Sequence, residues 1–213
     1  MRTSFARSSQ VDAIARVCAL AEGQWGLVGL SQVGVSEKVL KQWADAGIVE
    51  PVADGVIRVC AGGRHPHPDI YAAWLRTGTK PAWERSTTSL VVSHRTAVRL
   101  YGAGQLAGEQ LEFTGRAPEA AGVVVHSAIL SEAECAVVEG LPVTAPARTL
   151  ADLAVDDGFD VSDLGRVARS MLTAGWTTAD ELGPQLTAAF TRRGLPRDGV
   201  QWLSTALDAA QAG

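Results

Sequence analysis

A short segment carries side chains that could bind a nucleic acid. Residues 37–47 place Lys38, Lys41 and Gln42 on one face of a predicted helix, and the apolar residues of the segment fall on the opposite face. Ser36 precedes the helix and suits its N-cap. Lysine neutralises backbone phosphates, and glutamine can pair bidentately with adenine in the major groove. The pattern predicts a helix that binds DNA.

The elements around this helix follow the order of a winged helix-turn-helix. A helix over 11–21 and a short helix over 30–34 precede it, and two short strands joined at Asp54-Gly55 follow it. An Asp-Gly pair between apolar runs is a strong hairpin signal. Such a hairpin would bring Arg58 close to the DNA backbone. The alternative is a small α+β domain that binds protein or nothing.

Polar residues that could contact a ligand or a partner protein occur at two later helix starts. Ser93 suits an N-cap and would place His94 and Arg95 in the first turn. Arg148 and Asp152 are four residues apart on another predicted helix. That spacing is typical of a helix-surface salt bridge, which stabilises a helix only slightly. The alternative is that Arg148 binds a phosphate or a partner protein.

The sequence contains no recognisable metal site or catalytic motif. His65 and His67 each precede a proline and have no third ligand nearby, so an exposed loop is the better interpretation. Cys18, Cys60 and Cys135 lie far apart and form neither a zinc pair nor a disulfide framework. A phosphate-binding loop, a dinucleotide-binding motif and the signatures of ordinary protein kinases are absent. We therefore expect no cofactor and no metal.

Composition excludes two broad classes of protein. Of the 213 residues, 46% are hydrophobic and 20% charged, which is unlike a disordered chain. No apolar run approaches the roughly 18 residues of a membrane span, and the N-terminus has no apolar signal segment, so a cytoplasmic protein is expected. Residues 1–116 hold 13 basic and 10 acidic side chains, whereas the remainder holds 6 and 13. This asymmetry permits a basic DNA-binding part joined to an acidic module.

A Gly/Pro-rich break at 61–68 suggests two domains. We predict a winged helix-turn-helix DNA-binding domain over 1–64 and a second domain over 69–213. Strand-like segments at 111–115 and 122–127 lie among longer helical patterns. The fold class expected is α+β, with the winged helix followed by a mainly helical C-terminal domain that contains a small β element.

Three segments resemble the AbiEi family, the antitoxins of type IV toxin–antitoxin pairs. Residues 19–59 are similar to the N-terminal winged helix of the family. VVSHRTAVRLYGAG (91–104) is like its Ser-His-Arg-Ser/Thr-Ala segment, and VVEGLPVTAPARTLADLA (137–154) is like its Gly-Leu-Pro-Val-Thr segment with the following Arg-Thr-Leu-x-Asp-Leu-Ala. One departure is Ile57, which stands where the family usually has the tyrosine of Gly-Val-Tyr at the wing.

The resemblance implies two roles. The winged helix would repress its own operon by binding inverted repeats in promoter DNA, which would suit a homodimer, and the C-terminal part would neutralise a nucleotidyltransferase toxin. Two other functions stay open: an atypical serine/threonine kinase that uses ATP to phosphorylate the toxin, and a transcription factor that responds to a ligand. The candidates for contact with the toxin or a ligand are Ser93, His94, Arg95, Arg148 and Asp152.

Overall fold

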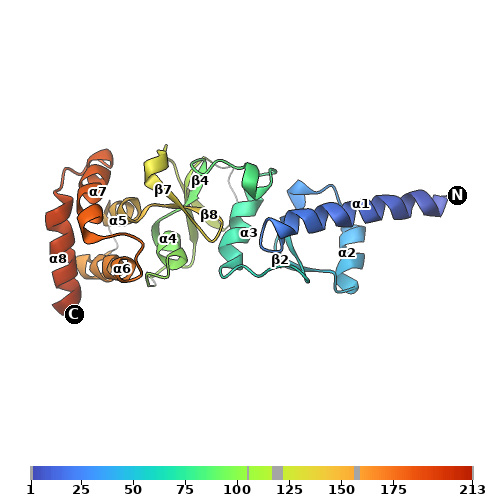
Figure 1. Cartoon of the computed structure of the whole chain (residues 1–213), viewed down its shortest axis with the longest axis horizontal. Helices are drawn as coiled ribbons and strands as arrows, with labels where there is room; N and C mark the ends of the chain where they lie inside the picture. The colour runs from blue at the N-terminus through green and yellow to red at the C-terminus, as the bar shows by residue number, and fades with distance from the viewer. Residues whose placement is uncertain (1, 105, 117–121, 156–158, 213) are drawn as a thin grey trace. The chain divides into compact units, whose positions relative to one another are not determined.

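The chain divides into two compact units. The computed structural model describes residues 2–104, 106–116, 122–155 and 159–212 (Figure 1). The first unit ends at Ser86, and the second comprises Thr87–Arg116 and Gly122–Gly213. The sequence placed the boundary at 64–69 instead. The structure moves it because the helix that follows the Gly/Pro-rich break packs against the sheet of the first unit.

The first unit contains a three-stranded antiparallel sheet and three α-helices. The sheet has the order β1-β3-β2, and β2 and β3 form the hairpin that the Asp-Gly pair predicted. In chain order the elements are α1 (Arg2–Glu22), β1 (Leu27–Gly29), η1 (Leu30–Gln32), α2 (Glu37–Asp45), β2 (Val49–Ala53), β3 (Val56–Val59), α3 (Pro68–Arg76) and η2 (Ala82–Glu84).

Both faces of this sheet are covered. Val17 of α1 and Trp43 of α2 pack in one apolar cluster with Ile57 and Val59 of β3. Side chains alternate along a strand, so the intervening Arg58 points to the other face. There α3 packs against all three strands, and none of its residues belongs to the cluster on the first face. The central strand β3 is therefore buried along its whole length.

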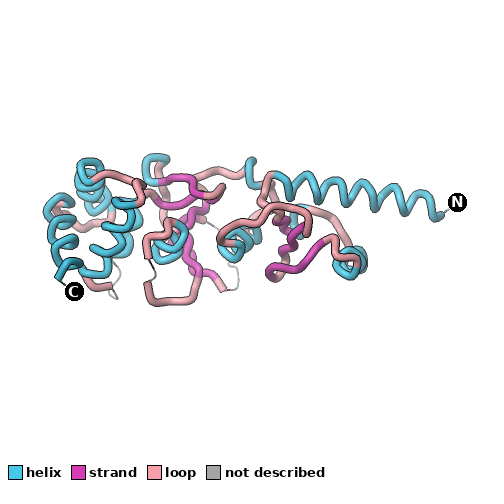
Figure 2. Tube along the Cα trace, turned by 60° about the horizontal axis from the view of Figure 1, so that its bottom comes forward, coloured by secondary structure: helices cyan, strands magenta, loops and turns pink. Residues whose placement is uncertain are grey.

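The second unit combines a five-stranded mixed sheet with α-helices. The sheet has the order β6-β5-β4-β8-β7, in which β4 runs parallel to β8 and β5 parallel to β6. Figure 2 shows the helices that follow β8 gathered together. The elements are β4 (Leu90–Val92), α4 (His94–Leu100), β5 (Leu111–Gly115), β6 (Val123–His126), η3 (Glu132–Glu134), β7 (Cys135–Val138), β8 (Leu141–Thr144), α5 (Pro146–Val155), α6 (Val161–Thr173), α7 (Ala179–Arg192) and α8 (Gly199–Ala212).

The predicted α+β class is confirmed, and several local predictions can be compared with the structure. Ser93 is the N-cap of α4, as expected. Helix α5, on which Arg148 and Asp152 were expected, begins at Pro146. Helix α7 opens with a capping box between Thr178 and Glu181. The N-cap of α3 is His67, and the helix begins with Pro68 at its first position. Among the described residues, no helix is long and apolar enough to cross a membrane.

Gly26 provides a test of the first unit. Its backbone has φ +81°, and a Cβ there would lie 2.4 Å from the carbonyl oxygen of Gly63. We expect Gly26→Ala to lower the free energy of unfolding by about 3 kcal/mol or more, because the strained φ adds to a backbone clash. Gly47 also has a positive φ of +69° but faces open space, so Gly47→Ala should cost only about 1 kcal/mol. Urea unfolding followed by circular dichroism measures both, and equal losses would contradict this account.

Candidate functional site

The exposed face of α2 is the first candidate site. Lys38, Lys41 and Gln42 are all exposed, and their spacing places them side by side on the helix. Trp43 on the opposite side is only 7% exposed and anchors the helix in the apolar cluster. Ser36 occupies the N-cap with extended backbone, although its side chain makes no capping hydrogen bond. The structure thus brings the predicted polar residues together on one accessible surface.

Arg58 does not belong to this surface. Its side chain is only 7% exposed, and its guanidinium donates hydrogen bonds of 2.6 and 2.8 Å to the Glu50 carboxylate on β2. The prediction that Arg58 reaches out from the hairpin was wrong. The physical reason is its register: it lies on the central strand and points to the face that α3 covers. Arg58 therefore holds the hairpin together.

The hairpin has an acidic rather than a basic exposed surface. Arg58 is the only basic residue between positions 49 and 59, and it is buried. Glu50 and Asp54 are both exposed there. Such a hairpin attracts phosphates less than α2 does, since like charges repel at close range. The basic side chains available in this part of the first unit are those of α2.

A second candidate site lies where two strands of the second unit end. β4 and β8 are parallel neighbours, paired at Val92 and Val143, and each leads within two residues into a helix. The starts of α4 and α5 therefore lie next to each other. In open α/β sheets, ligands bind beyond the carboxyl ends of parallel strands, and the β4–β8 pair forms one such end in this mixed sheet. Two polar clusters occur in this region of the second unit.

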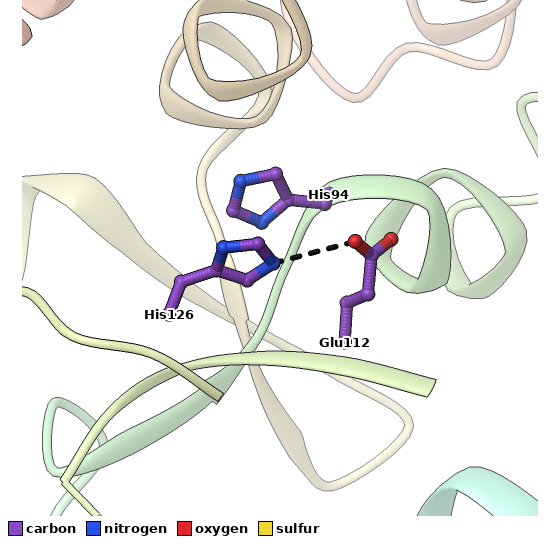
Figure 3. Close-up of side chains that lie close together, drawn as sticks. All are labelled: His94, Glu112 and His126. Atoms are coloured by element: carbon purple, nitrogen blue, oxygen red, sulfur yellow. Dashed lines mark hydrogen bonds and ion pairs between the residues drawn. The ribbon is translucent and has the colours of Figure 1, made fainter. Parts of the chain in front are cut away.

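The first polar cluster joins α4 to β5 and β6. His94 stacks on His126 with ring centroids 3.7 Å apart, and the Ser93 hydroxyl lies 2.9 Å from Nδ1 of His94. Nε2 of His126 is 3.3 Å from the Glu112 carboxylate, as Figure 3 shows. Arg95 donates to both oxygens of Glu112 over 2.8 and 2.9 Å. Three predicted residues thus meet here with two residues that the sequence analysis missed.

Glu112 is a carboxylate held ionised inside the protein. Its side chain is 1% exposed, and such burial by itself raises the pKa. Hydrogen bonds from His126 and Arg95 and the positive charges nearby outweigh burial and lower the pKa to about 2. A charged glutamate beside the apolar Leu111 and Phe113 of this strand was the one sequence signal that could have indicated a buried partner. The negative charge is thus available to cations at neutral pH.

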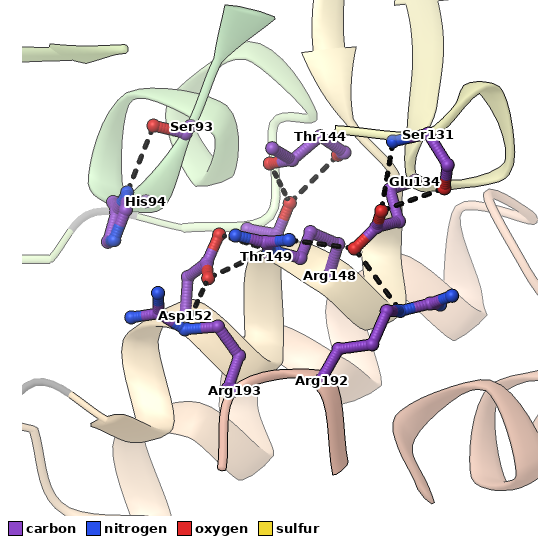
Figure 4. A network of polar contacts seen from close by, with 10 residues as sticks. All are labelled: Ser93, His94, Ser131, Glu134, Thr144, Arg148, Thr149, Asp152, Arg192 and Arg193. Atoms are coloured by element: carbon purple, nitrogen blue, oxygen red, sulfur yellow. Dashed lines mark hydrogen bonds and ion pairs between the residues drawn. The ribbon is translucent and has the colours of Figure 1, made fainter. Parts of the chain in front are cut away.

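The second polar cluster is centred on Arg148. Its Nε lies 2.9 Å from both oxygens of Asp152, and its NH1 lies 2.7 Å from Oε1 of Glu134 (Figure 4). Arg193 approaches Asp152 to 3.1 Å, and Arg192 approaches Glu134 to 3.4 Å. Positive and negative groups therefore alternate across the cluster. It ties η3 and α5 to the end of α7.

Both sequence-based interpretations of Arg148 need correction. Its side chain is 6% exposed and that of Asp152 is fully buried, so the pair is not a surface salt bridge. A guanidinium that is buried and bonded to two carboxylates is also not presented to a toxin or a phosphate. Burial lowers the pKa of Arg148, but hydrogen bonds to Asp152 and Glu134 and their charges raise it above its usual value. Arg148 is a charged structural residue.

Neither a scan against models of known protein families nor a search of curated proteins finds a match to this chain. The geometry therefore carries the functional argument. The first unit offers an accessible polar helix face, and the second offers polar clusters that are mostly buried.

The Arg148 cluster predicts a large loss of stability on truncation. Arg148→Ala leaves two buried carboxylates without their shared cation, and we expect the free energy of unfolding of the second unit to fall by about 3–5 kcal/mol. The matched control is Arg166→Ala, because Arg166 pairs with Asp163 on the surface of α6. That change should cost less than about 1 kcal/mol. Guanidinium unfolding of the full chain compares them, and similar losses would contradict a structural role for Arg148.

Proposed function

We propose that the first unit is a winged helix-turn-helix domain that binds DNA. The order of its elements supports this, since α1, η1 and α2 are followed by the β2–β3 hairpin, and β1 joins the same sheet. The exposed face of α2 carries the proposal. Its side chains are free to reach into a major groove while the buried tryptophan fixes the helix on the core.

The residues of this face divide into two roles. Lys38 and Lys41 contact phosphates, because lysine acts as a flexible point charge. Gln42 reads a base edge, where its amide can both donate and accept. The hairpin contributes little electrostatic attraction, since Arg58 is paired with Glu50 and the exposed charges are acidic. α2 is therefore the main DNA-binding element in this proposal.

We further propose that the chain is an antitoxin that represses its own operon and neutralises a nucleotidyltransferase toxin. The resemblance to AbiEi antitoxins supports this role. Two segments that carry the resemblance, 91–104 and 137–154, contain β4 with α4 and β8 with α5. These elements are neighbours in the centre of the second unit. The polar residues of the two segments are mostly buried, so contact with the toxin would fall on other, exposed residues of this unit.

A lysine double variant tests DNA binding. We expect Lys38→Ala with Lys41→Ala to weaken binding to the upstream promoter. The slope of log K against log salt concentration should become shallower by the amount that corresponds to the loss of about two phosphate contacts. Lys80→Ala is the matched control, since Lys80 is exposed in the first unit but lies outside α2. Fluorescence anisotropy at several salt concentrations measures the slope. Equal slopes for the double variant and the control would remove α2 from the proposal.

Gln42 separates base reading from phosphate contact. Gln42→Ala should leave binding to unrelated DNA unchanged and reduce the preference for the promoter by about 1–3 kcal/mol, because only the base contact is lost. Competition between promoter and scrambled duplexes measures that preference. A uniform loss on both duplexes would contradict a base-reading role.

The antitoxin role is tested with the same full-length variants. The lysine double variant should lose repression of a promoter reporter. It should still protect cells that express the nucleotidyltransferase encoded by the neighbouring gene. Loss of both activities together would contradict their assignment to different units. The mass of toxin recovered from protected cells is also measured by mass spectrometry. Unmodified toxin supports an antitoxin that acts by binding, whereas an added phosphate would favour the kinase alternative.

A further inference from the structure

Two imidazoles and one carboxylate converge in the second unit from three different elements. His94 is the first residue of α4, Glu112 lies on β5, and His126 is the last residue of β6. One ligand atom of each lies within 4.8 Å of the others (Figure 3). Zinc bonds of about 2.0–2.1 Å place tetrahedral ligand atoms about 3.4 Å apart, so the ligand atoms must move inward by about 1 Å. The imidazoles of His94 and His126 are stacked with 21° between their planes, so closing the site also requires one ring to turn out of the stack until both nitrogens point at the ion.

The side chains around this trio are of the kind that support metal ligands. A metal-binding residue is usually oriented by a second hydrogen bond from behind. The Ser93 hydroxyl bonds Nδ1 of His94, and Arg95 holds both oxygens of Glu112. A carboxylate has about four acceptor sites. Arg95 can therefore keep its hydrogen bonds to Glu112 while a metal ion takes the place of the His126 hydrogen bond at Oε1 of Glu112.

The backbone at His94 is also unusual. His94 has φ +51°, a left-handed conformation that costs a non-glycine residue about 1–2 kcal/mol. Such conformations persist where the surrounding structure imposes them, and they cluster at ligand-binding and active sites. Here the conformation belongs to the residue whose ring stacks on His126. This observation is independent of the distances within the trio.

The charges around the trio are compatible with a bound cation. The positive groups nearby are Arg95 and Arg193, and each is paired with a carboxylate, Glu112 and Asp152 respectively. Asp152 also bonds Arg148, so each of these guanidinium groups has a carboxylate partner. The imidazoles supply neutral nitrogen ligands when they are deprotonated. His126 is 34% exposed, which gives an ion a path from solvent.

We propose that His94, Glu112 and His126 bind a divalent transition-metal ion, for which zinc is the best match. Two histidine nitrogens and one glutamate oxygen form a known type of zinc ligand set, in which the fourth position takes water. The bound ion would join the start of α4 to β5 and β6. It would therefore stabilise the second unit, and this does not depend on DNA binding or on a toxin.

Cobalt and zinc test the site directly on the full chain. Chelator-treated protein is titrated with Co²⁺, whose visible absorption reports nitrogen and oxygen ligation, and then with Zn²⁺ by calorimetry. We expect one equivalent to bind and the melting temperature of the second unit to rise. His126→Ala should weaken binding by about 100-fold or more, since losing a ligand costs at least as much as losing an outer partner. His126→Gln gives the same test if the alanine variant fails to fold.

His67→Ala is the matched control, because His67 lies in the first unit and outside the trio. It should leave the affinity, the cobalt spectrum and the rise in melting temperature unchanged. Absence of saturable binding by the wild-type chain would overturn the proposal. So would wild-type affinity in both His126 variants, or loss of binding in His67→Ala.

Discussion

The buried guanidinium of Arg148 is the interaction on which the second unit depends. It lies between Asp152, which is on the same helix α5, and Glu134, which is the last residue of η3. One cation therefore joins η3 to α5. Because burying an isolated charge costs far more free energy than one contact returns, the three groups are stable inside only as a set. Arg192 and Arg193 extend the set to α7. The sheet and the helices after it are thus held together by charge as well as by apolar packing.

The basic side chains of this chain act in two different ways. In the second unit Arg95 and Arg148 are bonded to buried carboxylates, and in the first unit Arg58 is paired with Glu50. These residues maintain the folds. On α2, by contrast, Lys38 and Lys41 remain exposed. Arginine suits the buried positions because its planar fork bonds two oxygens at once, whereas lysine suits a flexible contact with phosphate.

Local patterns in the sequence predicted much of the fold, and pairings between distant residues remained hidden. The apolar spacing around Trp43 and the Asp-Gly turn located α2 and the hairpin because each depends on neighbouring residues. The burial of Arg58 depends on its strand being central, which is a property of the whole sheet. His126 and Glu112 meet only because β5 and β6 are parallel neighbours, and the sequence analysis identified neither. The candidate site on α2 was thus accessible to sequence reasoning, and the polar clusters were not.

The sharing of one guanidinium between two carboxylates also constrains how this chain can evolve. A single exchange at position 148 leaves Asp152 and Glu134 charged in a dry interior, whereas a simultaneous exchange of all three for apolar residues of similar volume need not be harmful. A single substitution at one of these three positions therefore lowers the stability of the fold, whereas simultaneous compensating substitutions avoid that loss. Among descendants of this chain, positions 134, 148 and 152 should vary together or not at all.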